Sequence, residues 1–586
     1  MTFTDYIRQQ TVGITTLFNP GYSSCNCRLN VDIVLADLVT PEIRSRKSDP
    51  EFPLGIDVIG RRLIDEGFTT DYSFLPPESV CRNMVMRNEY LMTFGWSGAA
   101  NTPVKNARLL GINMMNYLQT PQFFMFLKLA GIPPLRMERT GDFPLVILGG
   151  HIWYNPLPLS DFYDILVAGD GEEVLCQIAQ LVSSYGNNRK KLLKAVAGLQ
   201  GTFVPGYTHD TVRPVRIDFA EERYSAGSSV VVNGTGAVIL SRGCPFGCAF
   251  CCNRAVGGNY QVKPYSQVIR HIDLLSAAGV KRVLLCAAVG SLYRSEGRGY
   301  ADVIHEIQLR GMSVRCMSDR PESLDSAVLE AIKNDKNRIT IALECHPRIR
   351  RSVFCKSISE NMVDRLVDRC IRTGIGKIHF YLIVAVPPVI PGNVVHLPGG
   401  FDGESYEDLV YCAEWGIRCA EKMRTAGVPR KSNDPYVILD SMPLIPAPGT
   451  ALESVPFPRW ERYLLSMHWL DELIPRKYRK MVRVTPAIDP LSHLLQALLE
   501  RGAAVSGRAV FRACQMNGFS APDYKEVLSA MAVDGIDEQS LFSAIPPDGL
   551  PYRGIIEQAF HRCEETPEGE YLDTGRGGGG TGETTG

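Results

Sequence analysis

Three cysteines in the middle of the chain carry the strongest chemical signal in this sequence. Cys244, Cys248 and Cys251 lie in the run Ser241-Arg-Gly-Cys-Pro-Phe-Gly-Cys-Ala-Phe-Cys-Cys252, with the spacing CxxxCxxC and the aromatic Phe250 before the third cysteine. Three thiolates on one short loop can bind three irons of a [4Fe–4S] cluster and leave the fourth iron open to a substrate or cofactor. The chain has 17 cysteines in 586 residues. Composition alone therefore predicts only about 0.014 chance matches to this spacing.

Two other interpretations of these cysteines stay open. Structural zinc sites usually combine two close pairs of ligands, and no second pair with that spacing occurs in the sequence. Isolated buried thiols are common, but the regular spacing, with glycines at 243 and 247, favours a ligand loop. Cys25 and Cys27 form a CxC pair, which by itself is a weak metal signal.

The cysteine run resembles the signature of the radical S-adenosylmethionine (SAM) superfamily, in which CxxxCxΦC, with Φ aromatic, follows the first strand of a barrel. The resemblance implies that Cys244, Cys248 and Cys251 bind a [4Fe–4S] cluster, whose fourth iron is chelated by the amino and carboxylate groups of SAM. It also implies that Phe250 lies beside the SAM adenine. Cys252 is extra to the pattern and is predicted to be a packing residue.

The composition is that of an ordinary globular protein. The net charge is −1 and 45% of the residues are hydrophobic, so there is no electrostatic sign of nucleic-acid binding. No run of about 18 apolar residues predicts a membrane span, and the N-terminus lacks the pattern of a secretory signal. The cysteines form no disulfide framework of the small-domain kind, so a cytoplasmic location is expected.

Strands and helices alternate before the cysteine run. Strands are predicted over 31–36, 70–75, 90–94, 145–148 and 164–168, and a helix over 54–64. This alternation indicates a parallel α/β sheet, whose ligands bind beyond the carboxyl ends of the strands. Glycine-rich loops follow three of the strands, and glycine lets a ligand approach the backbone closely.

These loops together resemble the cobalamin-binding domain that precedes many radical SAM barrels. The match runs from Ile147-Leu-Gly-Gly-His151 to Ala168-Gly-Asp-Gly-Glu-Glu173, within about residues 28–200. His151 replaces a proline-like position of the pattern, and the stretch 105–140 is longer than the pattern predicts. The resemblance implies a Rossmann-like domain with the corrin over the strand ends. The residues that it places along the nucleotide tail of cobalamin are Ser97, Gly149, Gly150 and Gly169.

The loop after Ala36 contains no histidine that could bind cobalt. Cobalamin domains of the methionine-synthase type supply this ligand through a DxHxxG motif. An arginine could cover the lower corrin face instead, although a solvated basic face is the more frequent role for any one of the candidates. These candidates are Arg44, Arg46, Arg61 and Arg62. A five-coordinate methylcobalamin of this kind is expected to release its methyl group more readily.

Strand–helix alternation resumes at the cysteine run. Strands are predicted over 237–240, 282–286, 313–317, 339–344, 377–385 and 436–440, and helices over 266–278, 300–310, 324–333 and 360–373. Six such units predict a partial (β/α)6 barrel, the fold that the resemblance implies. The reactive end of a parallel barrel lies at the carboxyl ends of its strands, and the cysteine loop follows the first strand.

Four further barrel positions bear on catalysis. Glu344 ends the fourth strand, and the resemblance makes it a candidate for binding the ribose or amine of SAM; a salt bridge with Arg348 is the alternative. The second strand should end in a GGE-like turn that holds the SAM amino group, but it reads Cys286-Ala-Ala-Val-Gly290 and has no acid. Tyr293 and Tyr300 follow. A tyrosine can act as a general base when a neighbour lowers its pKa, and packing is the alternative.

The predicted class is therefore α/β, with a helical C-terminal region. The predicted domains are 1–210 (N-terminal segment and cobalamin-binding Rossmann-like domain), 211–455 (radical SAM barrel), 456–570 (helical domain) and 571–586 (disordered tail). The C-terminal helices are expected to pack on the barrel. A loop rich in glycine and proline, from 384 to 403, is expected at the barrel mouth.

Cobalamin with a radical SAM barrel implies transfer of a methyl group from SAM, via methylcobalamin, to a carbon of a small molecule. An electron donor such as flavodoxin or ferredoxin is the implied partner, with no nucleic acid and no membrane. The missing acid favours a nucleophilic sp² carbon such as C2 of tryptophan, and tryptophan 2-C-methyltransferases have this architecture. The alternatives are cyclisation, rearrangement or oxidation on the same scaffold, and a non-catalytic Fe–S electron carrier or sensor.

Overall fold

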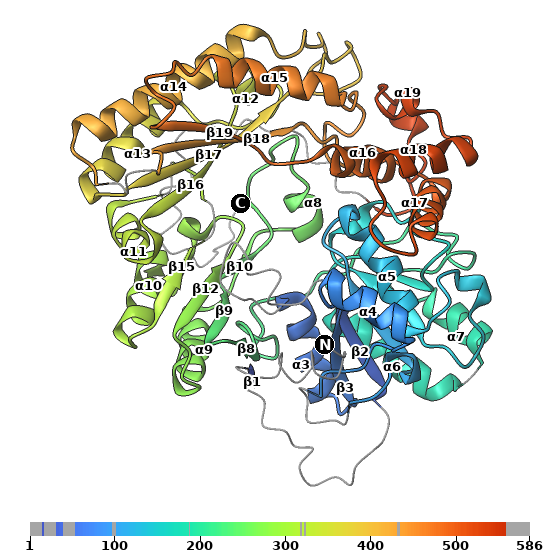
Figure 1. Ribbon diagram of the computed structural model, residues 1–586. Coiled ribbons are helices and arrows are strands. Elements are labelled where there is room, and N and C mark those ends of the chain that lie inside the picture. Colours follow the sequence, from blue (N-terminus) through green and yellow to red (C-terminus); the bar gives the residue numbers. More distant parts are fainter. Residues whose placement is uncertain are drawn as a thin grey trace, which may run out of the picture.

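The chain folds into two parallel α/β units and a group of C-terminal helices (Figure 1). The computed structural model describes residues 14–16, 31–38, 53–95, 101–186, 188–316, 319–321, 324–429 and 434–557. Five of the positions singled out above lie outside these residues, as does the predicted tail at 571–586: Cys25, Cys27, Arg44, Arg46 and Ser97. The α/β class predicted from the sequence is confirmed.

The first unit is a sheet with the strand order β3-β2-β4-β5-β6-β7. Its strands are β2 (Ile33–Asp37), β3 (Thr70–Phe74), β4 (Leu109–Asn113), β5 (Leu145–Gly149), β6 (Ile165–Val167) and β7 (Thr202–Phe203). All pairs are parallel except β6 with β7. The helices are α3 (Leu54–Asp65), α4 (Glu78–Arg87), α5 (Thr120–Ala130), α6 (Glu172–Tyr185) and α7 (Arg189–Val196). Since β2 lies between β3 and β4, the strand order reverses there, which is where ligands bind in such sheets.

The third strand of this sheet differs from the prediction. Residues 90–94 form no strand, and only Met92 makes an isolated bridge, with Pro103. The strand is β4, inside the stretch 105–140. Gly111 interrupts its apolar run, yet a Cβ at this position would lie 2.9 Å from Leu35 Cδ2 on the neighbouring strand. Close packing against β2 therefore requires a glycine in β4, and this glycine breaks the apolar pattern by which a strand is predicted from sequence.

The second unit is a partial barrel of parallel strands, as predicted. Its strands are β9 (Thr235–Ile239), β12 (Arg282–Cys286), β15 (Ser313–Arg315), β16 (Arg338–Glu344), β17 (Lys377–Val384), β18 (Val437–Pro443) and β19 (Val482–Pro486). A parallel bridge between Asp319 and Ile341 connects the two halves. The covering helices are α9 (Tyr265–Ala277), α10 (Tyr300–Leu309), α11 (Ser326–Lys336), α13 (Glu360–Thr373), α14 (Tyr406–Thr425) and α15 (Trp460–Glu472). Figure 1 shows these strands as an arc with the helices on its outside.

Both ends of the barrel extend beyond the predicted limits. The range 456–570 was predicted to be helical, but β19 pairs in parallel with β18 and adds a seventh strand. Val482 is buried there in the core between the sheet and its helices. At the other edge, β1 (Ile14–Thr16) pairs with β8 (Val230–Val232). Residues 14–16, which the domain prediction grouped with the first unit as an N-terminal segment, therefore join the barrel sheet.

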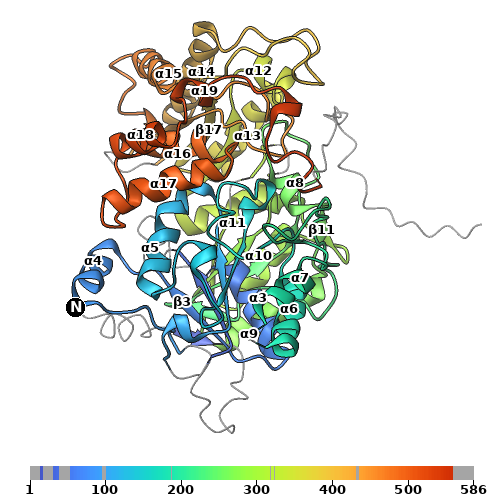
Figure 2. The same ribbon diagram turned by 90° about the vertical axis from the view of Figure 1, so that its right-hand side faces the viewer.

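The prediction that the C-terminal helices pack on the barrel holds for α15, whereas the last helices pack on the first unit. They are α16 (Pro490–Leu499), α17 (Ala504–Met516), α18 (Tyr524–Val533) and α19 (Glu538–Leu541). Figure 2 shows α17 beside α5, and the rings of Phe511 and Phe124 meet edge to face at 5.0 Å. Gly507 lets the helix approach the chain, because a Cβ there would lie 1.7 Å from Pro158 O. Within the described residues, no helix is long and apolar enough to cross a membrane.

Glu500, just after α16, is expected to make stability depend on pH. The carboxyl group is buried between the helices and the first unit, and Tyr154 donates a hydrogen bond to its Oε2 at 3.2 Å. Burial raises the pKa of Glu500 from 4.5 to about 7, and the Tyr154 bond offsets part of this rise. The folded state therefore holds the proton more tightly than the unfolded state, so stability falls as the pH rises from about 4.5 to about 7.

Glu500→Gln is expected to remove that fall. Its free energy of unfolding, measured with urea, should exceed that of the wild type by about 2–3 kcal/mol at pH 8 and match it near pH 4.5. Glu414→Gln, on an exposed position of α14, is the control and should track the wild type at both values. A Glu500→Gln curve parallel to the wild type would contradict the assignment.

Candidate active site at the junction of the two units

A cavity of about 520 Å³ lies between the strand ends of the first unit and the mouth of the barrel. One side is formed by the ends of β2, β4, β5 and β6, and helix α3 adds Leu54 and Ile59. The other side is formed by Gly243 before the first cysteine and by Cys286 at the end of β12. A large concave site with a mainly apolar lining and a few polar groups is typical of a cofactor or substrate pocket.

Three of the predicted glycines line this cavity, and the structure shows why glycine occupies each position. Gly150 has φ 100° and a Cβ there would lie 2.2 Å from Met114 O; Gly169 has φ 92° and a Cβ would lie 2.1 Å from Val215 O. Both are therefore required by the backbone. A Cβ at Gly149 would meet no atom within 4 Å. Gly149 is thus the glycine whose missing side chain leaves space in the cavity.

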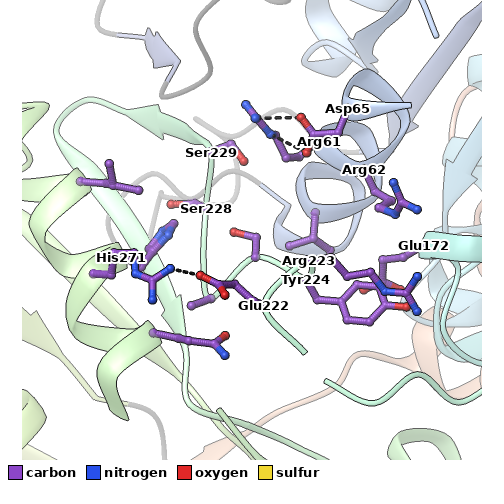
Figure 3. Close-up of a pocket in the computed structure, with 16 residues that line it drawn as sticks. Arg61, Arg62, Asp65, Glu172, Glu222, Arg223, Tyr224, Ser228, Ser229 and His271 are labelled. Carbon is purple, nitrogen blue, oxygen red and sulfur yellow. Dashed lines mark hydrogen bonds and ion pairs between the residues drawn. The ribbon is translucent and has the colours of Figure 1, made fainter. Parts of the chain in front are cut away.

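Arg61 and Arg62 face away from this cavity, so neither covers its α3 side. They line a smaller cavity of about 270 Å³ between α3, α9 and residues 222–229 (Figure 3). There Arg61 pairs with Asp65 at 2.8 Å, and Arg62 pairs with Glu173 at 2.9 Å. The face of α3 toward the large cavity is apolar.

His151 also lines the large cavity, next to Gly150. Burial lowers the pKa of its imidazole, so the ring is neutral near pH 7. Among the described residues of the lining, His151 is the only histidine.

The cysteine loop is fixed to the barrel at both ends. β10 (Ser241–Arg242) pairs with β11 (Gln261–Val262). Gly243 has φ 71° and a Cβ there would lie 2.4 Å from Asn259 O, so this position requires glycine. Further along, Ala249 N donates to Phe354 O at 2.9 Å, and the rings of Phe250 and Phe354 meet at 4.9 Å. Phe250 is therefore positioned by packing, on the loop that carries the cysteines.

The loop fits a cluster by the chemistry of its donors. Burial raises the pKa of both Cys248 and Cys251, and the neighbouring thiols, Cys244 included, raise it further. A bound metal would be needed to hold them as thiolates. Within the described residues, no three His, Cys, Asp or Glu side chains converge tightly enough for a single metal ion. A [4Fe–4S] cluster does not need such convergence, because each thiolate binds a different iron.

Two cations lie beside Cys248. Arg320 Nη1 is 4.0 Å from Cys248 Sγ, and the guanidinium lies over the Phe246 ring at 3.7 Å from its centre. Lys356 forms a buried ion pair with Glu344 at 2.6 Å. Burial raises the pKa of Cys248, and these two cations oppose that rise. The sequence pattern does not reveal Arg320 or Lys356, because neither belongs to the cysteine motif.

Glu344 therefore lies where it was predicted, near the cysteine loop, but its partner differs from the predicted alternative. Arg348 pairs with Asp408, with Nε 3.2 Å from Oδ1. Lys356 instead bonds Glu344 and also Ala342 O at 2.7 Å. Contact of Glu344 with SAM stays a prediction.

Tyr293 and Tyr300 are packing residues in this structure. Tyr293 is fully buried and its hydroxyl donates to Lys263 O at 2.8 Å. Tyr300 is buried beneath Gly290. Burial raises the pKa of both tyrosines, which is the opposite of what a general base needs. The packing alternative therefore replaces the catalytic role predicted for them.

Arg242 ties the two units together and was missed by the sequence analysis. It directly precedes Gly243, and its guanidinium contacts Asp170 at 3.4 Å and Glu172 at 2.6 Å on the first unit. It also lies over the Phe219 ring. The acids belong to the Gly-Asp-Gly-Glu-Glu loop, but nothing in the sequence pairs them with an arginine about 70 residues away.

The barrel is partial and parallel, and its three cysteines lie in the loop that follows β9, the first parallel strand. This arrangement defines a class of proteins that hold an iron–sulfur cluster at the barrel mouth. Residues 238–416 match the family described as Radical SAM superfamily, and residues 65–205 match Radical SAM proteins, N-terminal. The chain belongs to the radical SAM superfamily, which implies a [4Fe–4S] cluster and SAM as cofactors.

One solved structure shares this fold at low sequence identity, and a second is reported beside it. The radical S-adenosylmethionine methyltransferase TsrM from Kitasatospora setae, solved with cobalamin and a [4Fe–4S] cluster, is 14% identical, with a TM-score of 0.50 over 86% of this chain and 100% of that one. OxsB, a cobalamin-dependent S-adenosylmethionine radical enzyme, is 12% identical with a TM-score of 0.47, over 88% of this chain and 72% of that one.

Curated relatives match over a shorter stretch. The ribosomal protein uS12 methylthiotransferase RimO of Clostridium acetobutylicum is 22% identical over 207 residues, which is 32% of this chain and 46% of that protein. The chain thus spans less than half the length of this relative.

Proposed function

We propose that the protein is a cobalamin-dependent radical SAM C-methyltransferase that moves a methyl group from SAM to a carbon of a small molecule. The observation that carries the proposal is the large cavity, because it joins the strand ends of a Rossmann-like sheet to the cysteine loop. The shared fold with TsrM, whose structure holds cobalamin and a cluster, supports the same assignment.

The lining of the cavity fits a corrin. Gly149 leaves open space, and the loops at Gly150 and Gly169 bring the backbone to the cavity edge. Leu54 and Ile59 of α3 provide an apolar wall that excludes water and offers no ligand to a metal. Bound cobalamin would supply a carrier for the methyl group between SAM and the substrate carbon.

The turn after β12 bears on the type of methyl transfer. It contains no carboxylate, and Cys286, Ala287 and Ala288 line the cavity instead. The absence of the acid that usually holds the SAM amino group favours polar transfer to a nucleophilic sp² carbon over radical cleavage of SAM. C2 of tryptophan is the specific acceptor that we propose. A low-potential electron donor such as flavodoxin or ferredoxin, in the cytoplasm, completes this proposal.

The test is anaerobic reconstitution with iron, sulfide and hydroxocobalamin, followed by incubation with SAM, L-tryptophan and a reductant. We expect a bound corrinoid in the absorption spectrum, S-adenosylhomocysteine without 5′-deoxyadenosine, and 2-methyltryptophan. No bound corrinoid would overturn the cobalamin assignment. 5′-Deoxyadenosine with a cyclised or oxidised product would favour the alternative chemistry on this scaffold, and no consumption of SAM would favour an electron carrier or sensor.

A further inference from the structure

The inner face of the barrel sheet β16–β19 carries partly exposed side chains. Successive residues of a strand point to opposite faces, and on β17 Phe380 and Leu382 are buried in the core beneath the helices. Tyr381, between them, is 45% exposed, and Met442 on β18 is 37% exposed. Large apolar side chains thus line the inside of the arc without being covered.

One row of residues crosses four strands of this face. The register places Ala342 beside Tyr381, Tyr381 beside Asp440, and Asp440 beside Thr485. The row lies two residues before Glu344, or about 7 Å along the strand. Because β16 ends at Glu344, β17 at Val384 and β18 at Pro443, the row lies inside the barrel, a few residues before the carboxyl ends of these strands.

Asp440 gives this row a negative charge. His379 Nδ1 lies 3.1 Å from its Oδ2, and the Thr485 hydroxyl donates to its Oδ1. Burial alone would raise the pKa of Asp440, but the hydrogen bonds from His379 and Thr485 and the charge of Arg338 lower it overall. The carboxylate is therefore ionised at neutral pH. Its side chain is 24% exposed, and each of its oxygens can accept a second hydrogen bond.

We propose that this row is the substrate-binding surface of the barrel and that it selects an aromatic amine. The ammonium group would bind Asp440, and the flat apolar body would pack on Tyr381 and Met442, whose ring and thioether suit an aromatic partner. A carboxylate at the same position would be repelled by Asp440. The inference deepens the proposed methyltransferase function, on which its reaction rests, by naming the substrate class.

Calorimetric titration of the reconstituted holoenzyme with tryptamine tests the surface. Tryptamine should bind, and indole-3-propionate, which has a carboxylate in place of the ammonium, should not. Asp440→Asn should weaken tryptamine binding about 10- to 100-fold, as expected for loss of a charged hydrogen bond. Thr485→Val keeps the carboxylate and should change the dissociation constant less than about threefold.

Tyr381→Leu provides a second, independent variant, because an exposed ring is not needed for folding. It should weaken tryptamine binding about 5- to 10-fold through loss of the aromatic face. Failure of tryptamine to bind the wild type, or equal binding to wild type and Asp440→Asn, would overturn the inference. Equal binding of indole-3-propionate would do the same.

The outcome is separable from that of the methyltransferase assignment. S-Adenosylhomocysteine formation from SAM and reduced cobalamin, measured in the wild type without any acceptor, reports on the methyltransferase assignment alone. Its absence from the wild type would count against the proposed function and leave the binding result standing. Normal formation with no tryptamine binding would count against the substrate class alone.

Discussion

Cys248→Ala is expected to remove the iron–sulfur cluster and all SAM-dependent turnover. Cys248 is the central cysteine of the loop, and its thiol lies beside Arg320 and the Lys356–Glu344 pair. Without it, two of the three cysteines remain, which is too few to hold a cluster that normally has three or four thiolate ligands. Iron content should fall from about four per chain to near zero after anaerobic reconstitution. Turnover should fall more than about 100-fold, since loss of even an outer partner of a metal ligand costs 10- to 100-fold.

Cys252→Ala is the matched control, because Cys252 is adjacent to the loop but outside the CxxxCxxC spacing. It packs against the core of the first unit, and burial raises the pKa of its thiol to about 11, as suits a neutral packing residue. This variant should keep its iron, the visible absorbance of the iron–sulfur cluster and its activity. An intact cluster in Cys248→Ala, or equal loss of iron in both variants, would refute the assignment of ligands.

The cysteine loop could be predicted from sequence because its chemistry is local. All three thiols lie within eight residues, and Gly243 marks the backbone turn that the loop requires. The parallel strands could likewise be predicted, since a strand buried on both faces is a short apolar run whatever its neighbours are. The seventh strand of the barrel could not be predicted, because Val482–Pro486 is a strand only by pairing with β18.

Within the site, the sequence did not predict the directions in which side chains point. Tyr293 and Tyr300 follow the strand that ends at the cavity, but both rings point into the core, and chain position alone does not determine this. The ion-pair partner of Glu344 could not be predicted either. Arg348 and Lys356 both follow Glu344 closely in the sequence, and only the packing of the folded chain shows that Lys356 is the partner. The roles of Arg242 and Asp440 could not be predicted from sequence, because their partners lie on strands and loops that are distant in the chain.

Gly149→Leu is expected to weaken cobalamin binding without unfolding the protein. A Cβ at Gly149 meets no atom within 4 Å, and its φ is not in the left-handed range, so the larger side chain can be accommodated in the empty cavity. There it would occupy space that the cofactor needs. Overpacking of a filled site costs about 1–3 kcal/mol, which corresponds to a dissociation constant about 10- to 100-fold higher for hydroxocobalamin.

Two other glycines separate this effect from loss of stability. Gly399→Leu is the control outside the cavity: a Cβ there also meets no atom within 4 Å, and both cobalamin affinity and melting temperature should stay at the wild-type values. Gly150→Ala should behave in the opposite way to Gly149→Leu. Its φ of 100° and the approach to Met114 O should cost about 1–3 kcal/mol of folding free energy.

Absorbance titration with hydroxocobalamin and thermal unfolding of the three variants decide the question. Because the cysteine loop lies on the barrel side of the cavity, Gly149→Leu should keep its iron and be weakened only in corrinoid binding and methyl transfer. That combination would show that the two cofactors occupy opposite walls of one cavity. Wild-type cobalamin affinity in Gly149→Leu would instead mean that cobalamin binds elsewhere, and the cavity would then have to be assigned to SAM or substrate.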